Sequence, residues 1–154
     1  MSKTVVRSVE YFYASVEDRP GQAAELLALL AEGGVDLLAF SVVPTGASHT
    51  QLQIFPASSG QLQSVAKRAN LALAGPHYAL LVQGDNELGA LVELHRKLAA
   101  DNINIYASTG VADNHDGFGY VLYVRPEDFK RAATAASVPN PPSWHPQPHV
   151  KPVG

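Results

Sequence analysis

The chain has 154 residues, a length that suits one compact domain or two very small ones. Apolar residues make up 46% of it and charged residues 16%, and the formal net charge is -3. It can therefore build a core, but it has no general attraction for nucleic acid, which usually requires a basic face. The sequence contains no cysteine, which excludes disulfides and thiolate chemistry.

Nothing in the sequence predicts a membrane segment. Lys3 and Arg7 precede no apolar signal-like run, and no stretch approaches about 18 uninterrupted apolar residues. We therefore expect neither secretion nor membrane insertion, and the cytoplasm is the default location.

The first half of the chain predicts strands and helices in the order β-α-β-β-α. Residues 8–17 (SVEYFYASVE) are rich in aromatic and β-branched side chains and indicate a strand. Asp18 is placed to cap the following helix, and Pro20 to fit its first turn, where a missing N–H costs nothing. Two further strands are predicted at 35–43 and 49–55, followed by a second helix.

The pattern then starts again. A strand at 78–85 leads into a turn and helix at 86–102. When Gly21 is aligned with Gly89, an offset of 68 (89 minus 21), several leucine, alanine and glutamate positions of the two helices coincide. The sequence therefore predicts an internal duplication.

The end of the second copy shows a small difference in length. A strand is predicted at 119–125 and a helix at 126–136, where Pro126 matches Pro56 at an offset of 70. We expect the two extra residues in the polar turn at 113–117, because turns absorb insertions easily.

A repeated β-α-β-β-α plan predicts an α+β fold of two ferredoxin-like repeats, with an antiparallel sheet and helices on one face. We expect the first repeat at 1–75, the second at 76–136 and a Pro-rich tail at 137–154. Each repeat should end in a fourth strand, yet Pro139 and the prolines after it exclude one from a sheet interior. We predict that a segment near 78–83 serves both repeats, and that the first strand of the chain fills the other vacant position, giving one six-stranded sheet.

Two short motifs carry a resemblance to a known family. Residues 86–91, Asn-Glu-Leu-Gly-Ala-Leu, resemble the Asn/Asp-x-x-Gly-x-Leu signature that ends the first strand of ACT domains. Residues 18–23, Asp-Arg-Pro-Gly-Gln-Ala, resemble a second copy, with Ala23 where leucine is usual. The resemblance covers about residues 8–136 and implies a regulatory module that typically senses an amino acid where the first-strand turn of one unit faces its neighbour.

The predicted binding residues lie in these two turns. They are Asp18, Arg19, Pro20, Gly21 and Gln22 in the first repeat, and Asn86, Glu87, Leu88 and Gly89 in the second. A helix N-terminus offers N–H groups to a carboxylate, and Asp18 or Asn86 can accept a hydrogen bond from an ammonium group. If only one of the two turns binds a ligand, we expect the first turn to bind an anionic group, because Arg19 adds a carboxylate contact.

The alternative interpretation of the two turns is structural. In it Asp18 and Asn86 are helix caps, and Gly21 and Gly89 let each helix pack tightly on the sheet.

Other residue patterns favour structure over chemistry. The six histidines include no pair with ligand spacing on a helix, and His95, which aligns with Leu27, is expected to be a partly buried helix residue. The sequence DNHDG at 113–117 is typical of a turn, and Tyr11, Phe12 and Tyr13 are expected to pack in a strand. Without a nucleotide fingerprint or a catalytic arrangement, we expect no metal, no cofactor and no enzymatic activity.

Three hypotheses of function follow. In the first, the chain is a regulatory protein that binds an amino acid or small carboxylate and passes that state to an enzyme partner. In the second, it is an interaction subunit without a ligand, resembling the small regulatory subunit of acetohydroxyacid synthase at Val42-Val-Pro-Thr45. In the third, it is a small enzyme that uses Asp113, His115 and Asp116. A homodimer is an open alternative, and neither nucleic acid nor a membrane is an expected partner.

The tail at 137–154 contains six prolines and Trp144. Such a segment favours extended structure, and we expect Trp144 to dock on an apolar groove of this chain or of a partner.

Overall fold

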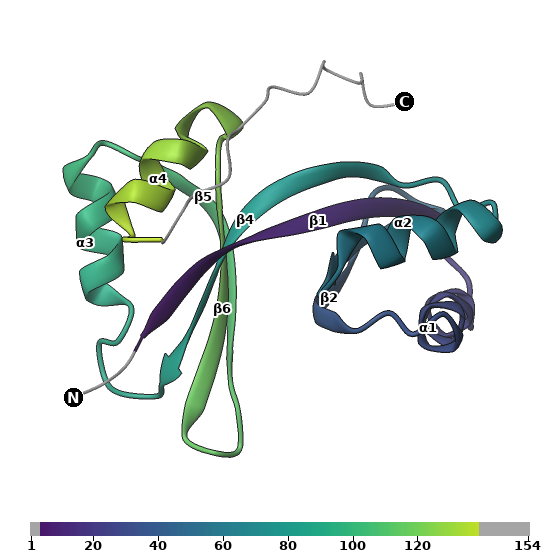
Figure 1. The fold of residues 1–154 in the computed structure, drawn as a ribbon, viewed down its shortest axis with the longest axis horizontal. Helices are drawn as coiled ribbons and strands as arrows, with labels where there is room; N and C mark the ends of the chain where they lie inside the picture. The colour runs from purple at the N-terminus through teal and green to yellow at the C-terminus, as the bar shows by residue number, and fades with distance from the viewer. Residues whose placement is uncertain (1–3, 139–154) are drawn as a thin grey trace. The chain divides into compact units, whose positions relative to one another are not determined.

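The computed structural model describes residues 4–138 and has an α+β fold (Figure 1). The elements are β1 (Val5–Glu17), α1 (Gln22–Glu32), β2 (Leu37–Pro44), β3 (His49–Pro56), α2 (Ser59–Arg68), β4 (Ala74–Asp85), α3 (Val92–Ala100), β5 (Ile105–Ala112), β6 (Gly117–Val124), the 3-10 turn η1 (Pro126–Asp128) and α4 (Phe129–Ala135). The strands are hydrogen-bonded in the order β2-β3-β1-β4-β6-β5, so the predicted six-stranded sheet is confirmed. Trp144 and the rest of the tail from residue 139 lie outside the described residues.

The chain divides into two compact units, and the boundaries fall inside β1 and β4. One unit spans Val9–His77 and holds most of β1, then α1, β2, β3, α2 and the start of β4. The other combines Met1–Ser8 with Tyr78 onward, and so holds the start of β1 together with the rest of β4, α3, β5, β6 and α4. Each unit thus has the β-α-β-β-α-β content of a ferredoxin-like repeat, as the sequence predicts.

The fourth strand of each unit is supplied by the first strand of the other repeat. In the Val9–His77 unit, a Cβ added to Gly75 would lie 2.9 Å from the Tyr11 carbonyl oxygen, which places the start of β4 beside β1. In the other unit, Arg7 Nη2 donates to Gln83 Oε1 at 3.5 Å, which places the start of β1 beside β4. The prediction of a shared strand is therefore correct in kind but wrong in detail, because the first repeat uses the start of β4 and not residues 78–83.

Alternation along β1 explains how the first repeat builds its core. Phe12 and Ala14 point to one face of the strand and pack with Leu52 and Ile54 of β3. The helices cover this face with Leu26 and Leu30 of α1 and Leu62 and Val65 of α2. Tyr11 and Tyr13 lie on the other face, so the prediction that the aromatic run packs in a strand is confirmed.

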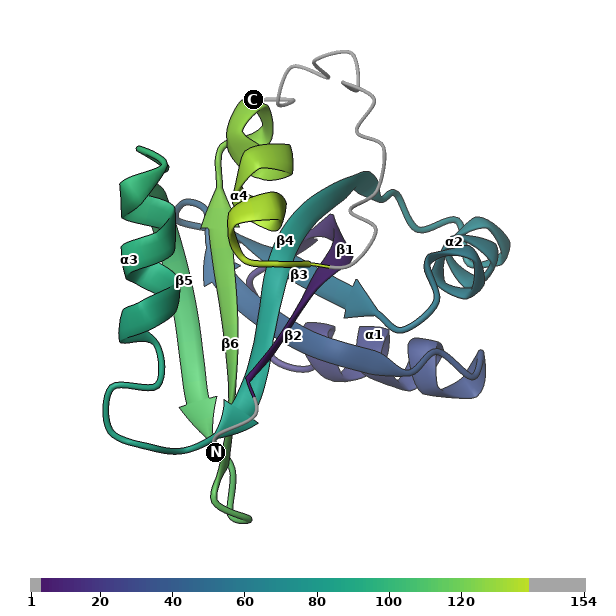
Figure 2. The ribbon, with the colours of Figure 1, turned by 60° about the vertical axis from the view of Figure 1, so that its left-hand side comes forward.

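The second repeat builds its core in the same way. Leu80 and Val82 of β4 and Leu122 of β6 form the covered face. Leu94 and Leu98 of α3 and Phe129 of α4 close it, and Figure 2 shows the two helices side by side on this face. Both helix pairs therefore cover one face of their own strands, as predicted.

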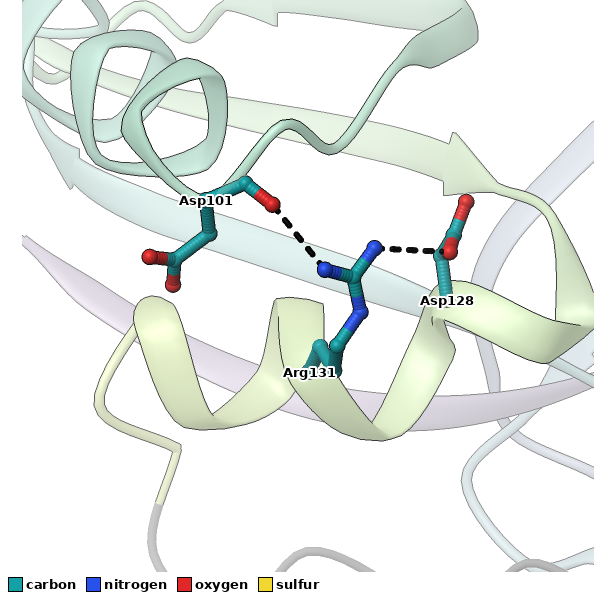
Figure 3. A network of polar contacts seen from close by, with 3 residues as sticks. All are labelled: Asp101, Asp128 and Arg131. Carbon is teal, nitrogen blue, oxygen red and sulfur yellow. Dashed lines mark hydrogen bonds and ion pairs between the residues drawn. The ribbon is translucent and has the colours of Figure 1, made fainter.

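A small polar network joins the ends of α3 and α4 (Figure 3). Arg131 Nη1 donates to the Asp101 carbonyl oxygen at 3.0 Å, and Arg131 Nη2 lies 2.9 Å from Asp128 Oδ1. The Asp101 carbonyl belongs to the C-terminal end of α3, where backbone oxygens have no partner within the helix. Arg131 satisfies one of them and links α4 to the end of α3.

Backbone hydrogen bonds repeat at the offset of 68. The Asp18 amide donates to the Ser48 carbonyl at 2.8 Å, and the Asn86 amide donates to the Asp116 carbonyl at 2.8 Å. The register agrees, because Glu17 pairs with His49 just as Asp85 pairs with Gly117. The duplication therefore extends to the backbone geometry of the turns.

The predicted position of the extra residues is wrong. The β2–β3 turn spans residues 45–48 and the β5–β6 turn spans 113–116, so the two hairpin turns have equal length. The difference comes after β6, where η1 precedes α4. Pro56 ends β3, whereas Pro126 begins η1, and so the two prolines are not equivalent.

Replacing Leu98 by alanine should lower the free energy of unfolding by about 2–5 kcal/mol, because this side chain is 0% exposed and its loss leaves a cavity between α3 and the sheet. Leu88→Ala is the matched control, since Leu88 is 106% exposed and its truncation should cost less than about 0.5 kcal/mol. Urea unfolding of both variants checks the prediction, and similar costs would contradict the assigned core.

Candidate functional site

The first predicted turn is held by its own residues. Arg19 Nε lies 3.4 Å from Glu17 Oε2, and both side chains are more than half exposed. With its amide oxygen turned toward the guanidinium, Gln22 also accepts from Arg19 Nε at 2.8 Å. The predicted carboxylate ligand of Arg19 would therefore have to compete with Glu17.

Helix α1 starts later than the sequence predicts. Its N-cap is Gly21 and its first residue is Gln22, so the predicted capping by Asp18 is wrong, and Pro20 lies before the helix. The Gln22 amide approaches the Arg19 carbonyl at 3.4 Å, which indicates a separate turn between strand and helix. Gly21 has a φ of +91°, a left-handed conformation that glycine adopts readily. A Cβ there would meet no atom within 4 Å, so this φ, rather than tight packing, explains the glycine.

The second turn has the same plan but is longer. The Ala90 amide donates to the Glu87 carbonyl at 3.1 Å, and the Val92 amide to the Gly89 carbonyl at 3.0 Å. Helix α3 begins at Val92 with Leu91 as N-cap, so capping by Asn86 is also wrong. Gly89 again has a positive φ of +74°, and Leu88 is fully exposed.

A hollow of about 390 Å³ lies beside this second turn. One side is formed by the turn itself and the other by the ends of β5 and β6 nearest their hairpin. Its lining residues are Asn86, Glu87, Gly89, Ala90, Leu91, Val92, Gly110, Val111, Ala112, Phe118, Gly119 and Tyr120. Three of the four residues predicted for a site in the second repeat therefore line one hollow.

The hollow has a mostly apolar lining with few polar groups. Glu87 is its one ionisable carboxylate among the described lining residues, and Asn86 supplies a side-chain amide. This composition resembles small-molecule sites, where an apolar surface is combined with a few polar groups that orient the ligand. The volume suits a small metabolite.

A second hollow, of about 380 Å³, continues along α3. It is lined by Leu91, Val92, His95, Arg96 and Ala99, and the first two residues also line the hollow beside the turn. We call the two adjoining hollows the α3 trough.

A hydrogen bond joins two residues of the α3 trough, Tyr120 from one hollow and His95 from the other. Tyr120 Oη lies 3.0 Å from His95 Nε2, and the rings are 5.8 Å apart between centroids. Tyr120 is buried and His95 is half-buried, which confirms the prediction of a partly buried histidine on this helix. Sequence reasoning missed Tyr120 and Gly110, although aligning the second and third strands of the two repeats at the offset of 68 would have singled them out.

The polar turn at 113–117 has a structural role. Asp113 Oδ1 accepts from the His115 amide at 2.7 Å and from the Gly117 amide at 2.9 Å, which confirms the prediction of a turn. Over residues 4–138, the side chains of His, Asp and Glu form no group of three or more that could hold a metal ion.

None of the helices between residues 4 and 138 is both long and apolar enough to span a bilayer.

Comparisons with known proteins identify the fold. No family model matches the chain, and no curated protein matches its sequence. Among solved structures, it is similar to a Bacteroides thetaiotaomicron protein with a TM-score of 0.70 and 16% identity, over 86% of this chain and 91% of that one. It is also similar to the ligand-free regulatory subunit of aspartate kinase from Thermus thermophilus, with a TM-score of 0.57 and 14% identity, over 88% and 94% of the two chains. The Thermus flavus regulatory subunit matches with a TM-score of 0.53 and 14% identity, over 88% and 94%.

These likenesses, together with the two turn motifs, confirm the resemblance stated from the sequence. The chain has the fold of ACT domains, in two repeats.

His77 lies among the aromatic rings of Tyr11 and Tyr13, on the face of the first repeat's strands opposite the helices. The ring centroid of His77 is 5.3 Å from that of Tyr11 and 5.0 Å from that of Tyr13. Burial lowers the pKa of His77 below its ordinary value of 6.5, because the charged form loses hydration among these rings. No pattern in the sequence predicts this contact, since His77 precedes the strand predicted at 78–85.

The lowered pKa of His77 predicts a loss of stability in acid. The folded protein binds the proton less readily than the unfolded chain, so stability is fully present above pH 6.5 and falls as the pH drops from there through the folded-state pKa. His77→Phe retains an aromatic ring and should lose less stability than the wild type between pH 7.5 and 5, as measured by urea unfolding.

His115→Phe is the control, because His115 lies in an exposed hairpin turn. It should follow the wild-type pH dependence, and parallel curves for the wild type and His77→Phe would contradict the prediction.

Proposed function

We propose that the chain is a non-catalytic regulatory protein that binds a small zwitterion, an amino acid above all, in the hollow beside the second turn. The observation that carries the proposal is the coincidence of that hollow with the ACT-like motif at Asn86 to Leu91. The structural alternative for the motif is weakened, since Asn86 does not cap α3. The ACT-domain fold supports a regulatory role.

The chemistry of the hollow suits both ends of an amino acid. The Asn86 side-chain oxygen and the Glu87 carboxylate are acceptors for an ammonium group. The positive end of the α3 dipole, at the N-terminus of the helix beside the hollow, suits a carboxylate. Leu91, Val92 and Phe118 then face the remainder of the ligand.

The first turn, Asp18 to Gln22, is the second candidate site. It has an arginine that the second turn lacks, but Glu17 is already that arginine's partner. Binding of a carboxylate at the first turn would therefore depend on Arg19, and binding at the second would not. One experiment can compare the two sites.

The ligand-bound state would be passed to an enzyme partner in the cytoplasm. The regulatory subunits of aspartate kinase with the same fold support this arrangement by analogy. Exposed apolar residues also favour an interaction surface: Val42 and Val43 on the outer strand β2 are 46% and 41% exposed. An interaction subunit without a ligand is thus the alternative, and a stoichiometric partner recovered from its own cells in the absence of any bound small molecule would favour it.

A thermal-shift screen of the standard amino acids tests the proposal. A ligand at about one hundred times its Kd stabilises the native state by about 2.7 kcal/mol, which should raise the Tm by about 5–10 °C. At least one amino acid should produce such a shift. If none does at millimolar concentration, the ligand-binding function is overturned.

Two substitutions decide which turn binds the responding amino acid. If the ligand lies beside the second turn, Glu87→Gln should weaken its binding by about 1–3 kcal/mol through loss of a charged hydrogen bond, and Arg19→Ala should leave the Kd unchanged. The opposite result would place the ligand at the first turn, as the sequence alone suggests. Calorimetric titration measures both, with the exposed Glu127→Gln as the charge-matched control.

A further inference from the structure

The two repeats place different side chains at three equivalent positions around the helix after the turn. At the offset of 68, Leu27, Val42 and Leu52 of the first repeat correspond to His95, Gly110 and Tyr120 of the second. Strand pairing supports this equivalence independently, because Val42 pairs with Leu52 and Gly110 pairs with Tyr120. Three apolar residues of the first repeat thus correspond to two polar residues and a glycine in the second.

The three residues of the second repeat depend on one another. A Cβ on Gly110 would lie 2.9 Å from Tyr120 Cδ2, so the tyrosine ring occupies the space that a side chain at 110 would need. From there its hydroxyl meets His95 at 3.0 Å. Gly110 makes room for the ring, and the ring brings its hydroxyl to α3.

Packing alone does not require this polar pair. The first repeat covers the equivalent strand face with a fully buried Leu52, and places the partly exposed Leu27 and Val42 where His95 and Gly110 stand. In the second repeat, Tyr120 lines one hollow of the α3 trough and His95 lines the other. The hydrogen bond therefore joins a residue that lines one hollow to a residue that lines the other, and the residues that both hollows share, Leu91 and Val92, are apolar.

We propose that Tyr120 and His95 determine the ligand specificity of the α3 trough by selecting an amino acid whose side chain carries a hydroxyl group. This inference rests on the proposed function, since it names the class of ligand for the same site. A tyrosine hydroxyl that bonds one imidazole nitrogen keeps further hydrogen-bonding capacity. A ligand hydroxyl can both donate and accept, so it fits the pair whichever of the two atoms holds the shared hydrogen.

An apolar ligand group in the same place would be disfavoured. A methyl group there would cover the polar atoms of Tyr120 and His95 without offering them a hydrogen bond. Sites built to bond a hydroxyl discriminate against the analogue that lacks it for this reason.

L-threonine and L-valine are suitable probes, because they have nearly the same shape and differ by a hydroxyl in place of a methyl group. Calorimetric titration of the full chain should give a Kd for L-threonine about tenfold lower than for L-valine. Tyr120→Phe keeps the ring and removes the hydroxyl. It should reduce the preference to less than about threefold while changing the L-valine Kd by less than about twofold.

His95→Leu installs the residue of the first repeat and should act in the same direction. Because His95 lies on the partly exposed side of α3, this variant tests the inference even if Tyr120→Phe does not fold. Tyr13→Phe removes a phenol hydroxyl from the first repeat, outside the trough, and should keep the wild-type ratio. The ratio of two affinities within one variant is not altered by a general loss of stability.

Equal wild-type affinities for the two probes, or a threonine preference that survives both substitutions, would overturn the inference and leave the proposed function standing. If the wild type binds no standard amino acid at all, the proposed function fails and this inference fails with it.

Discussion

The first strand of a ferredoxin-like repeat needs a hydrogen-bonding partner on both sides, and the rest of this structure depends on how that need is met. Between residues 4 and 138 there are three strands for each repeat, not four. Two long strands, β1 of 13 residues and β4 of 12, supply the missing fourth strands. The start of each strand belongs to one compact unit and its end belongs to the other. Each then ends at a turn that leads into a helix, which puts the two ACT-like motifs at equivalent places.

The duplication has kept the backbone and changed the side chains. Asp18 and Asn86 make the same 2.8 Å backbone hydrogen bond to the hairpin turn opposite, and Gly21 and Gly89 share a positive φ. The surroundings differ: the first turn contains an arginine paired with Glu17, whereas a mostly apolar hollow lined by Tyr120 adjoins the second. The two turns therefore share a backbone path and differ in the chemistry of their surroundings.

Helix capping shows where local sequence rules mislead. Asp18 and Asn86 stand at the usual distance before an amphipathic helix, and such residues are common caps. Here both are engaged through their backbone by a hairpin turn distant in sequence, and the helices begin later, at Gln22 and Val92. A tertiary hydrogen bond has set the path of the chain, and the glycine that follows redirects it into the helix.

The sequence by itself determined the order of the elements, the duplication and the class of fold. These follow from short-range patterns, such as the alternation around Phe12 and the helical spacing of Leu26 and Leu30, which one face of a strand or helix imposes on its residues. Tertiary structure decided the rest. Tyr120, Gly110 and His95 come from two strands and a helix, and their contact exists because strand register brings Tyr120 opposite Gly110 and packing brings α3 over both. A local sequence pattern holds no information about such a contact. The contact depends on distances between segments in space and not on their order along the chain.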